Sequence, residues 1–190
     1  MAITAAMVKE LREMTGAGMM DCKKALTETN GDMDAAVDVL KKSGAAKMEK
    51  KQSRIAAEGI ARVAVNGNVA VVAEVNSETD FVAKNETFQE FVQTVADTAL
   101  ASDLNGGANG EDIDALLATN GLNDLLVEKT ATIGEKLSVR RFEKVSGDVV
   151  TSYIHGGGRI GVVIAANGTA DDASKEALTN IAMQVAAMNP

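Results

Sequence analysis

Aromatic and reactive side chains are scarce in this chain of 190 residues. It contains no Trp, one Tyr, one His and one Cys, and only four Phe. Nucleophilic catalysis usually needs a nucleophile beside a base, and a metal site needs several Cys, His or carboxylate ligands. Because most of these combinations cannot be assembled here, we expect neither an enzyme nor a protein with a metal or another cofactor.

Two further absences concern the compartment. No apolar run approaches the roughly 20 residues needed to span a bilayer, and the N-terminus lacks the apolar centre of a signal peptide. The single Cys22 cannot form an intramolecular disulfide, whereas secreted domains of this size usually carry paired cysteines. The sequence therefore predicts a cytoplasmic protein without a membrane partner.

Basic residues are outnumbered, with 19 Lys and Arg against 27 Asp and Glu and a net charge of −8. Broad binding to nucleic acid relies on clustered Lys and Arg, so no direct nucleic-acid partner is expected. Basic residues do dominate the segment 47–54. A solvated tether is the favoured interpretation of that segment, and a nucleic-acid contact is the alternative.

Apolar residues recur with helical spacing in three short segments of residues 1–46. The first segment follows Thr4, a typical N-cap residue, the second covers about 19–27, and the third ends near Gly44. The second helix is expected to bury Met20, Leu26 and either Cys22 or Ala25. Three short helices predict a very small bundle, close to the lower size limit for independent folding.

Residues 59–190 mix strand and helix periodicity. Asn66-Gly67 between two apolar runs predicts a β-hairpin, because both positions of such a turn favour positive φ. A flexible loop is expected over 105–110. The other elements expected are a helix of roughly four turns from Phe88 to Leu100, helices over 111–118, 122–133 and 173–188, and strands over 136–145, 148–155 and 159–166. Strands and helices do not alternate, so we predict an α+β fold with an antiparallel sheet covered by helices.

The segment Gly156-Gly157-Gly158-Arg159-Ile160-Gly161 matches the pattern G-x-G-x-x-G of dinucleotide sites. Such a site needs a helix after the glycines, whereas here an apolar strand follows. A hairpin turn is therefore the favoured interpretation. His155, the only histidine, precedes this turn, where a structural hydrogen bond is favoured over contact with a partner.

The segment from Thr79 to Asn85 places a rare Phe at a junction between strand and helix. Phe81 lies seven residues before Phe88, and this spacing favours a buried helical stripe that starts at Phe81. The alternative depends on Asn85, which is itself a good N-cap residue. A helix that begins after Asn85 would leave Phe81 on a separate turn, with apolar surface that a monomer normally hides.

Three motifs together resemble the bacterial elongation factor Ts family. They are Val8-Lys9-Glu10-Leu11-Arg12 with Thr15-Gly16-Ala17-Gly18-Met19-Met20-Asp21-Cys22-Lys23-Lys24-Ala25-Leu26, then Thr79-Asp80-Phe81-Val82, then Tyr153-Ile154-His155 with Gly158-Arg159-Ile160-Gly161-Val162. They occur in family order over nearly the whole chain. The resemblance implies a ubiquitin-associated (UBA)-like three-helix domain over 1–46, a charged linker over 47–58 and an α+β core over 59–190.

The resemblance also implies a guanine-nucleotide exchange factor of translation elongation, with elongation factor Tu as the partner in its GDP-bound and nucleotide-free states. The segment Thr79, Asp80, Phe81 and Val82 would displace Mg²⁺ from that partner. The N-terminal domain would contact it through Lys9, Arg12, Met19, Met20 and Lys23. His155 would support the contact surface of the core, and no metal or cofactor is implied for this chain.

Two questions stay open at this point. Longer family members carry a second core subdomain, so a chain ending at Pro190 is either a short member that forms a homodimer or a piece of a longer member. The function also has alternatives. One is a UBA-type protein-binding module fused to an unrelated α+β domain, and the other is a nucleic-acid binder that uses residues 47–54 with Arg140 and Arg141.

Overall fold

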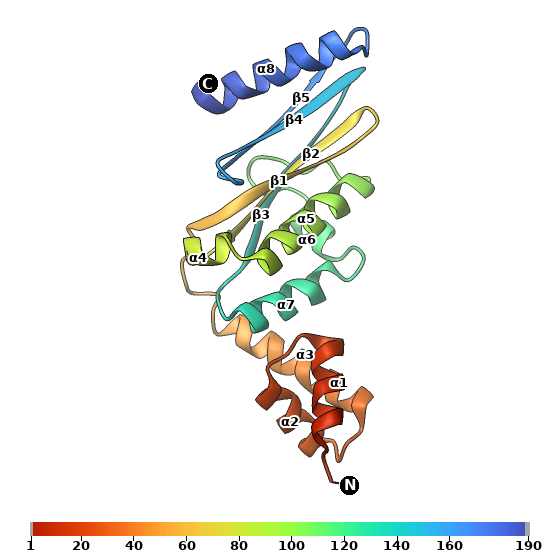
Figure 1. Ribbon diagram of the computed structural model, residues 1–190, viewed down its shortest axis with the longest axis vertical. Coiled ribbons are helices and arrows are strands. Elements are labelled where there is room, and N and C mark those ends of the chain that lie inside the picture. Colours follow the sequence, from red (N-terminus) through yellow and green to blue (C-terminus); the bar gives the residue numbers. More distant parts are fainter. Residues whose placement is uncertain (1, 189–190) are drawn as a thin grey trace. The chain divides into compact units, whose positions relative to one another are not determined.

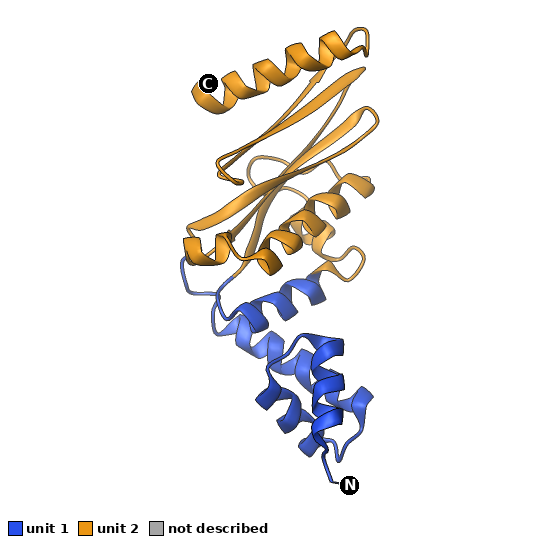
Figure 2. Ribbon diagram, in the orientation of Figure 1, with its two compact units in different colours: residues 1–55, 123–136 blue, residues 56–122, 137–190 orange. Residues whose placement is uncertain are grey.

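The computed structural model describes residues 2–188 and shows a mixed α+β protein, which confirms the predicted fold class. The chain divides into two compact units (Figure 2). Unit 1 comprises residues 1–55 and 123–136, and unit 2 comprises residues 56–122 and 137–190. The boundaries predicted from the sequence placed residues 123–136 in the core instead.

Unit 1 is helical, with α1 (Ala5–Thr15), α2 (Met19–Glu28), α3 (Met33–Glu49) and α7 (Leu122–Ile133). The Thr4 hydroxyl accepts a hydrogen bond from the Met7 amide at 3.3 Å, which confirms the predicted N-cap of α1. Gly16 ends α1 in a left-handed conformation with φ 64° and donates its amide hydrogen to the Arg12 carbonyl. Helix α1 therefore begins, and helix α2 begins and ends, close to where the sequence predicts.

The core of the first three helices consists of Val8, Leu11, Cys22, Ala25, Leu26 and Ala36. Cys22 and Ala25 are both buried, whereas the side chain of Met20 is 75% exposed. The expected burial of Met20 is therefore wrong. Met20 and Cys22 are separated by about 200° around the helix, so they cannot both face the same core.

Helix α3 continues to Glu49, beyond the end predicted near Gly44. Gly44 is buried, and a Cβ atom on it would lie 3.1 Å from Cγ1 of Val127 on α7. The glycine thus permits close packing of α3 on α7 and does not end the helix. This contact places α7 with the N-terminal helices.

Unit 2 contains a three-stranded antiparallel sheet of β1 (Glu58–Asn66), β2 (Val69–Ser77) and β3 (Ser138–Ser146), in the order β1-β2-β3. A separate antiparallel pair is formed by β4 (Val149–His155) and β5 (Ile160–Ala166). The predicted β1–β2 hairpin is confirmed, but Asn66 pairs with Val69, so the turn is Gly67-Asn68. Of the turn residues only Gly67 has positive φ, at 57°, as a type II′ turn requires.

Four layers make up unit 2 (Figure 1). Helix α5 (Glu86–Ala101) covers one face of the three-stranded sheet, and the β4–β5 pair lies against the other face. Helix α8 (Asp172–Met188) packs on the outer side of β4 and β5, where Ala182 and Ala186 meet Val162. The short helices α4 (Asp80–Ala83) and α6 (Ile113–Leu117) complete the unit.

The segment 105–110, expected to be a flexible loop, is hydrogen-bonded to the outer edge of β3. The Lys144 amide donates to the Asn105 carbonyl at 3.0 Å, and the Gly107 amide donates to the Phe142 carbonyl at 2.8 Å. The Lys144 ammonium group also donates to the carbonyls of Leu100 and Ser102 at the end of α5. Burial lowers the pKa of this ammonium group, and the nearby Asp103 partly opposes that effect.

Candidate functional site

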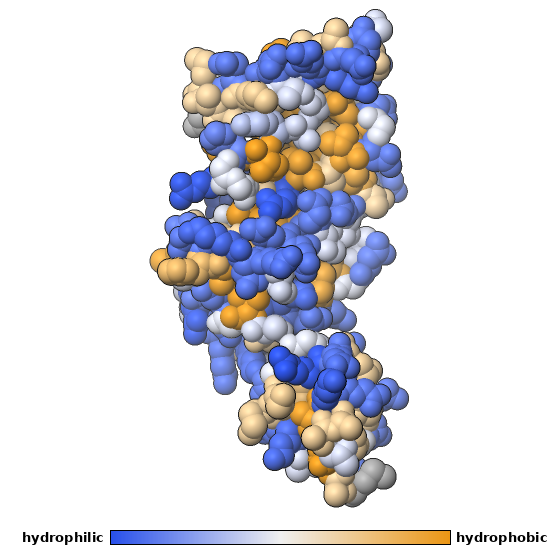
Figure 3. Space-filling view, in the orientation of Figure 1, coloured by the Kyte–Doolittle hydropathy of each residue, from blue (hydrophilic) through white to orange (hydrophobic). Residues whose placement is uncertain are grey.

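Helix α4 presents Phe81 to solvent. The side chain of Phe81 is 80% exposed, whereas Phe88, Phe91 and Phe142 are at most 1% exposed. The interpretation of Phe81 as the start of a buried stripe is therefore wrong. Hydrophobic atoms project among hydrophilic ones at the edge of unit 2 where α4 lies (Figures 1 and 3). An aromatic ring exposed to this extent can contribute a large apolar area to a contact with another molecule.

Hydrogen bonds define the α4 turn at both of its ends. The Thr79 hydroxyl accepts from the Val82 amide at 3.5 Å and caps α4, and the buried Ser77 hydroxyl donates to the Thr79 carbonyl at 3.1 Å. The Asn85 side chain accepts from the Phe88 amide at 3.2 Å and caps α5 separately. Two consecutive caps thus make α4 and α5 distinct helices.

Asp80 is charged and paired within α4. Its carboxylate accepts a hydrogen bond from the Lys84 ammonium group at 2.7 Å. The hydrogen bond and charge of Lys84 hold the pKa of Asp80 below its ordinary value of 3.8, and Arg159 at the β4–β5 turn contributes in the same direction. The turn beside Phe81 therefore carries an exposed ion pair between residues four apart.

The glycine motif forms the β4–β5 turn, as predicted. The Gly158 carbonyl accepts from the Ala61 amide on β1 at 2.7 Å, and a Cβ atom on Gly158 would lie 2.9 Å from Cβ of Ile60. The turn therefore sits against the start of β1. His155 precedes it and is exposed, with Nδ1 at 3.0 Å from the hydroxyl of Tyr153, its neighbour on the same face of β4.

Polar side chains connect this turn with α4. Gln89 on α5 donates from Nε2 to the Ala83 carbonyl of α4 at 3.2 Å. Arg62 on β1 donates from Nη2 to Oε1 of Gln89 at 3.0 Å and from Nη1 to the Gly157 carbonyl at 3.4 Å. Nothing in the sequence pattern pointed to Arg62 or Gln89, because their partners are far apart in the chain.

The candidate residues of the N-terminal part lie in unit 1 and are all exposed: Lys9, Arg12, Met19, Met20 and Lys23. Lys9 and Arg12 share a face of α1, and Lys23 shares a face of α2 with the two methionines, because residues three or four apart are neighbours on a helix. Met19 and Met20 expose 56% and 75% of their surface. Unit 1 thus presents apolar and basic groups together on its surface.

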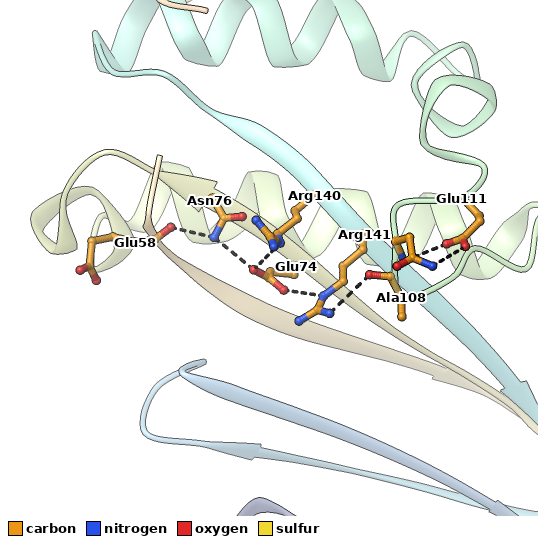
Figure 4. A network of polar contacts seen from close by, with 8 residues as sticks. Glu58, Glu74, Asn76, Ala108, Glu111, Arg140 and Arg141 are labelled. Atoms are coloured by element: carbon orange, nitrogen blue, oxygen red, sulfur yellow. Dashed lines mark hydrogen bonds and ion pairs between the residues drawn. The ribbon is translucent and has the colours of Figure 1, made fainter. Parts of the chain in front are cut away.

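A groove of about 910 Å³ lies between the three-stranded sheet and the beginning of β5. Its polar wall contains Glu74, whose carboxylate meets Arg140 at 3.6 Å and Arg141 at 2.7 Å (Figure 4). A register shift after Glu74 opposes this stretch of β2 with an extra residue of β3, so both consecutive arginines reach one acid. Glu74 is therefore paired with both arginines, and this cluster of one acid and two bases carries a net charge of +1.

Among residues 2–188, no group of His, Cys, Asp and Glu side chains could hold a metal ion. In the same part of the chain no helix is both long and apolar enough to cross a membrane. Among the described residues of unit 2, Phe81 is the most exposed large hydrophobic residue.

Comparison with known proteins gives one consistent result. A sequence profile for elongation factor TS matches residues 78–190, which include Phe81 and the glycine turn. The chain belongs to the elongation factor TS family. Curated elongation factor Ts proteins from Jannaschia sp. (strain CCS1) and Ruegeria pomeroyi are each 53% identical over 199 aligned residues, with the whole of this chain covered.

The chain spans 64% of the length of these elongation factor Ts relatives. Both compact units align with the same proteins, which overturns the alternative of a binding module fused to an unrelated α+β domain. All three motifs therefore lie within one continuous match to elongation factor Ts proteins.

Proposed function

We propose that this chain acts as a guanine-nucleotide exchange factor in translation elongation and promotes GDP release from elongation factor Tu. Membership of the elongation factor TS family supports the partner. The 80% exposure of Phe81 on a capped turn is the observation that carries the mechanism. Thr79, Asp80, Phe81 and Val82 form the segment that disturbs the Mg²⁺ and nucleotide site of the partner.

The proposed step is the insertion of the Phe81 ring between elements of the partner. Burial of one Phe side chain is worth roughly 1.5–3 kcal/mol, which corresponds to at most about a hundredfold in an equilibrium. This free energy opposes the closed arrangement that holds Mg²⁺ and GDP. The two caps define the local conformation of the turn, so little order has to be gained on binding.

A second contact, made by unit 1, completes the proposal. By linkage, an exchange factor must bind the nucleotide-free partner more tightly than the GDP-bound partner, and GDP then weakens the complex by the same factor. The burial of one Phe side chain is worth too little free energy to account for the whole acceleration of GDP release. Lys9, Arg12, Met19, Met20 and Lys23 supply the second contact, and His155 supports the contact surface of unit 2.

The proposal needs no catalytic side chain, cofactor or metal on this chain, because the partner holds the nucleotide and its metal ion. It requires neither a membrane nor direct contact with nucleic acid. The UBA-like character of the N-terminal helices, homodimer formation and a cytoplasmic location are predictions that the proposal does not depend on.

Release of a fluorescent GDP analogue from elongation factor Tu tests this function. We expect the unaltered chain to accelerate release and Phe81→Ala to reduce the acceleration by about tenfold or more, within the limit that burial of one Phe sets. Val65→Ala is the matched control, because Val65 is an exposed apolar residue, 45% exposed, near the opposite end of β1. With Val65→Ala, GDP should leave elongation factor Tu as fast as it does with the unaltered chain.

The melting temperatures of the variants separate function from folding. Removal of an exposed side chain usually changes stability by less than about 0.5 kcal/mol, so both variants should melt like the parent chain. An unaltered release rate with Phe81→Ala would overturn the insertion step. Absence of any acceleration by the parent chain would overturn the exchange function for this chain.

A further inference from the structure

The turn that carries Phe81 and the glycine turn of β4–β5 are joined by a chain of side-chain hydrogen bonds. The chain runs from the Ala83 carbonyl of α4 to Gln89, then to Arg62, and ends at the Gly157 carbonyl. We propose that Gln89 and Arg62 are positioning residues that hold the two turns as one surface and set the direction of the Phe81 side chain. The inference deepens the proposed exchange function and rests on it.

The chemistry of the link requires an amide at position 89. A guanidinium group only donates hydrogen bonds and a carbonyl oxygen only accepts them. Gln89 fits between them, because its Oε1 faces Arg62 at 3.0 Å and its Nε2 faces the Ala83 carbonyl at 3.2 Å. A carboxylate at this position could accept from Arg62, but it could not donate to Ala83.

Helix α4 depends on such contacts because it contains only four residues. Isolated helices shorter than about 12–15 residues are marginal in water, so α4 does not hold its own direction. Its buried anchor is Ala83, the residue whose carbonyl Gln89 binds. The link therefore acts at the point where the turn meets the body of unit 2.

At the other end of the link, Arg62 Nη1 lies 3.4 Å from both the Gly157 and the Ala61 carbonyl oxygens. Gly158 has φ 109°, and a Cβ atom there would lie 2.8 Å from Nη1 of Arg62. The Ala61 amide donates to the Gly158 carbonyl at 2.7 Å, so the turn is fixed to β1 beside Arg62. The Arg62–Gln89 and Gln89–Ala83 hydrogen bonds are partly buried, which limits competition from water for these two, whereas the Arg62–Gly157 bond is exposed.

The decisive variant is Gln89→Met, which keeps the length of the side chain and removes both hydrogen bonds. We expect the maximal rate of GDP release from elongation factor Tu to fall about fivefold, the factor that corresponds to the net contribution of one hydrogen bond, because only the bond to the Ala83 carbonyl reaches α4. Gln89→Glu should lose a similar factor, because it keeps the contact with Arg62 but cannot donate to Ala83. An unaltered rate for either variant would overturn the link.

Gln93 provides a matched control one turn further along α5. Its Nε2 donates to the Val63 carbonyl of β1 at 3.1 Å and to Asp97 at 3.0 Å, so it also joins α5 to β1. Gln93→Met should leave GDP release unchanged. An equal loss with Gln93→Met would show that general packing of α5 is responsible, which contradicts a positioning role for Gln89.

A double variant separates positioning from simple destabilisation. If Gln89 acts only through Phe81, Gln89→Met should cause no further loss in a chain that already carries Phe81→Ala. A full additional fivefold loss would overturn the proposal. If Phe81→Ala alone does not change the rate of GDP release, the proposed insertion fails instead. The link between the two turns is then tested by amide hydrogen exchange in the free chain.

Amide hydrogen exchange of the free chain gives that structural readout without elongation factor Tu. The amides of residues 82–85 should exchange faster in Gln89→Met than in the parent chain, and Gln93→Met should leave them unchanged. Unchanged protection in Gln89→Met would overturn the link, whatever the exchange assay shows.

Discussion

Phe81 and Phe88 lie seven residues apart, yet they have opposite environments. Phe88, on α5, is fully buried against the three-stranded sheet, whereas Phe81, on α4, is 80% exposed. Their sequence spacing would place both rings on one face of a continuous helix. The helix is not continuous, because Asn85 caps α5 and begins it after α4 has ended.

This difference shows that helical spacing has meaning only between two caps. The sequence contains Thr79 and Asn85 six residues apart, and each accepts a hydrogen bond from an amide three residues later. Each cap opens a separate helix with its own direction. As a result, one aromatic residue stabilises unit 2 and the other is available to a partner.

The largest effect on stability should follow replacement of the buried ring. Phe88→Ala removes a fully buried side chain and should lower the free energy of unfolding by about 3–5 kcal/mol, a large part of the stability of an ordinary domain. Phe81→Ala should change it by less than about 0.5 kcal/mol. Urea denaturation of the two variants measures the contrast, and similar losses would show that Phe81 is also part of the core.

A smaller loss should follow removal of the cap that separates the two helices. Asn85→Ala deletes the hydrogen bond to the Phe88 amide and should cost about 1 kcal/mol. It should also slow GDP release less than Phe81→Ala does. Asp32→Ala is the matched control, because Asp32 caps α3 in unit 1 through the Ala35 amide at 3.0 Å and should cost a similar free energy without affecting release through Phe81. Equal slowing of release by both variants would contradict a local role for Asn85.

Removal of the other cap should have an effect confined to α4. Thr79→Ala deletes the hydroxyl that accepts from Val82, and we expect faster amide exchange at Val82 with a change in unfolding free energy of at most about 1 kcal/mol. Thr79→Ser retains the hydroxyl and should restore the protection. If Thr79→Ser loses amide protection at Val82 as fully as Thr79→Ala does, the methyl group and not the cap holds the turn.

The smallest effect concerns the charge on α4. Lys84 lowers the pKa of Asp80 below 3.8, so the folded chain binds a proton at Asp80 less readily than the unfolded chain does. The stabilising contribution is therefore present above pH 3.8 and is lost as the pH falls through the lower value of the folded state. An NMR titration of the Asp80 carboxyl carbon should show the lowered pKa, and Lys84→Met should return it toward 3.8. An unchanged titration in Lys84→Met would exclude Lys84 as the cause.

Local chemistry made most of unit 2 predictable. Short apolar runs bounded by turn glycines placed every strand within a few residues, because strands covered on both faces carry apolar residues on both. The exact hairpin turn was missed, since Asn66 remains in β1 and pairs with Val69. The division of the strands into two sheets was also missed, because periodicity does not say which strands pair.

The candidate site was predictable only in part. The motif residues Thr79 to Val82 were identified, but the favoured interpretation buried Phe81 because residue spacing alone cannot decide which of two caps is used. Arg62 and Gln89 gave no signal, since their contacts join α4, α5, β1 and the β4–β5 turn. The sequence predicts a helix end near Gly44, because the contact of this glycine with α7 is distant in the chain and leaves no local signal.

The sequence by itself determined the fold class, the positions of most helices and strands, and the scarcity of catalytic groups. These properties depend on local hydrogen bonding, residue spacing and composition, all of which are present in the linear chain. Only the tertiary structure decided that α7 joins the N-terminal helices, that the strands form two sheets and that Phe81 faces solvent. Those outcomes depend on which distant surfaces pack together and exclude water. The free energy of burying that apolar surface is gained only when the chain has folded.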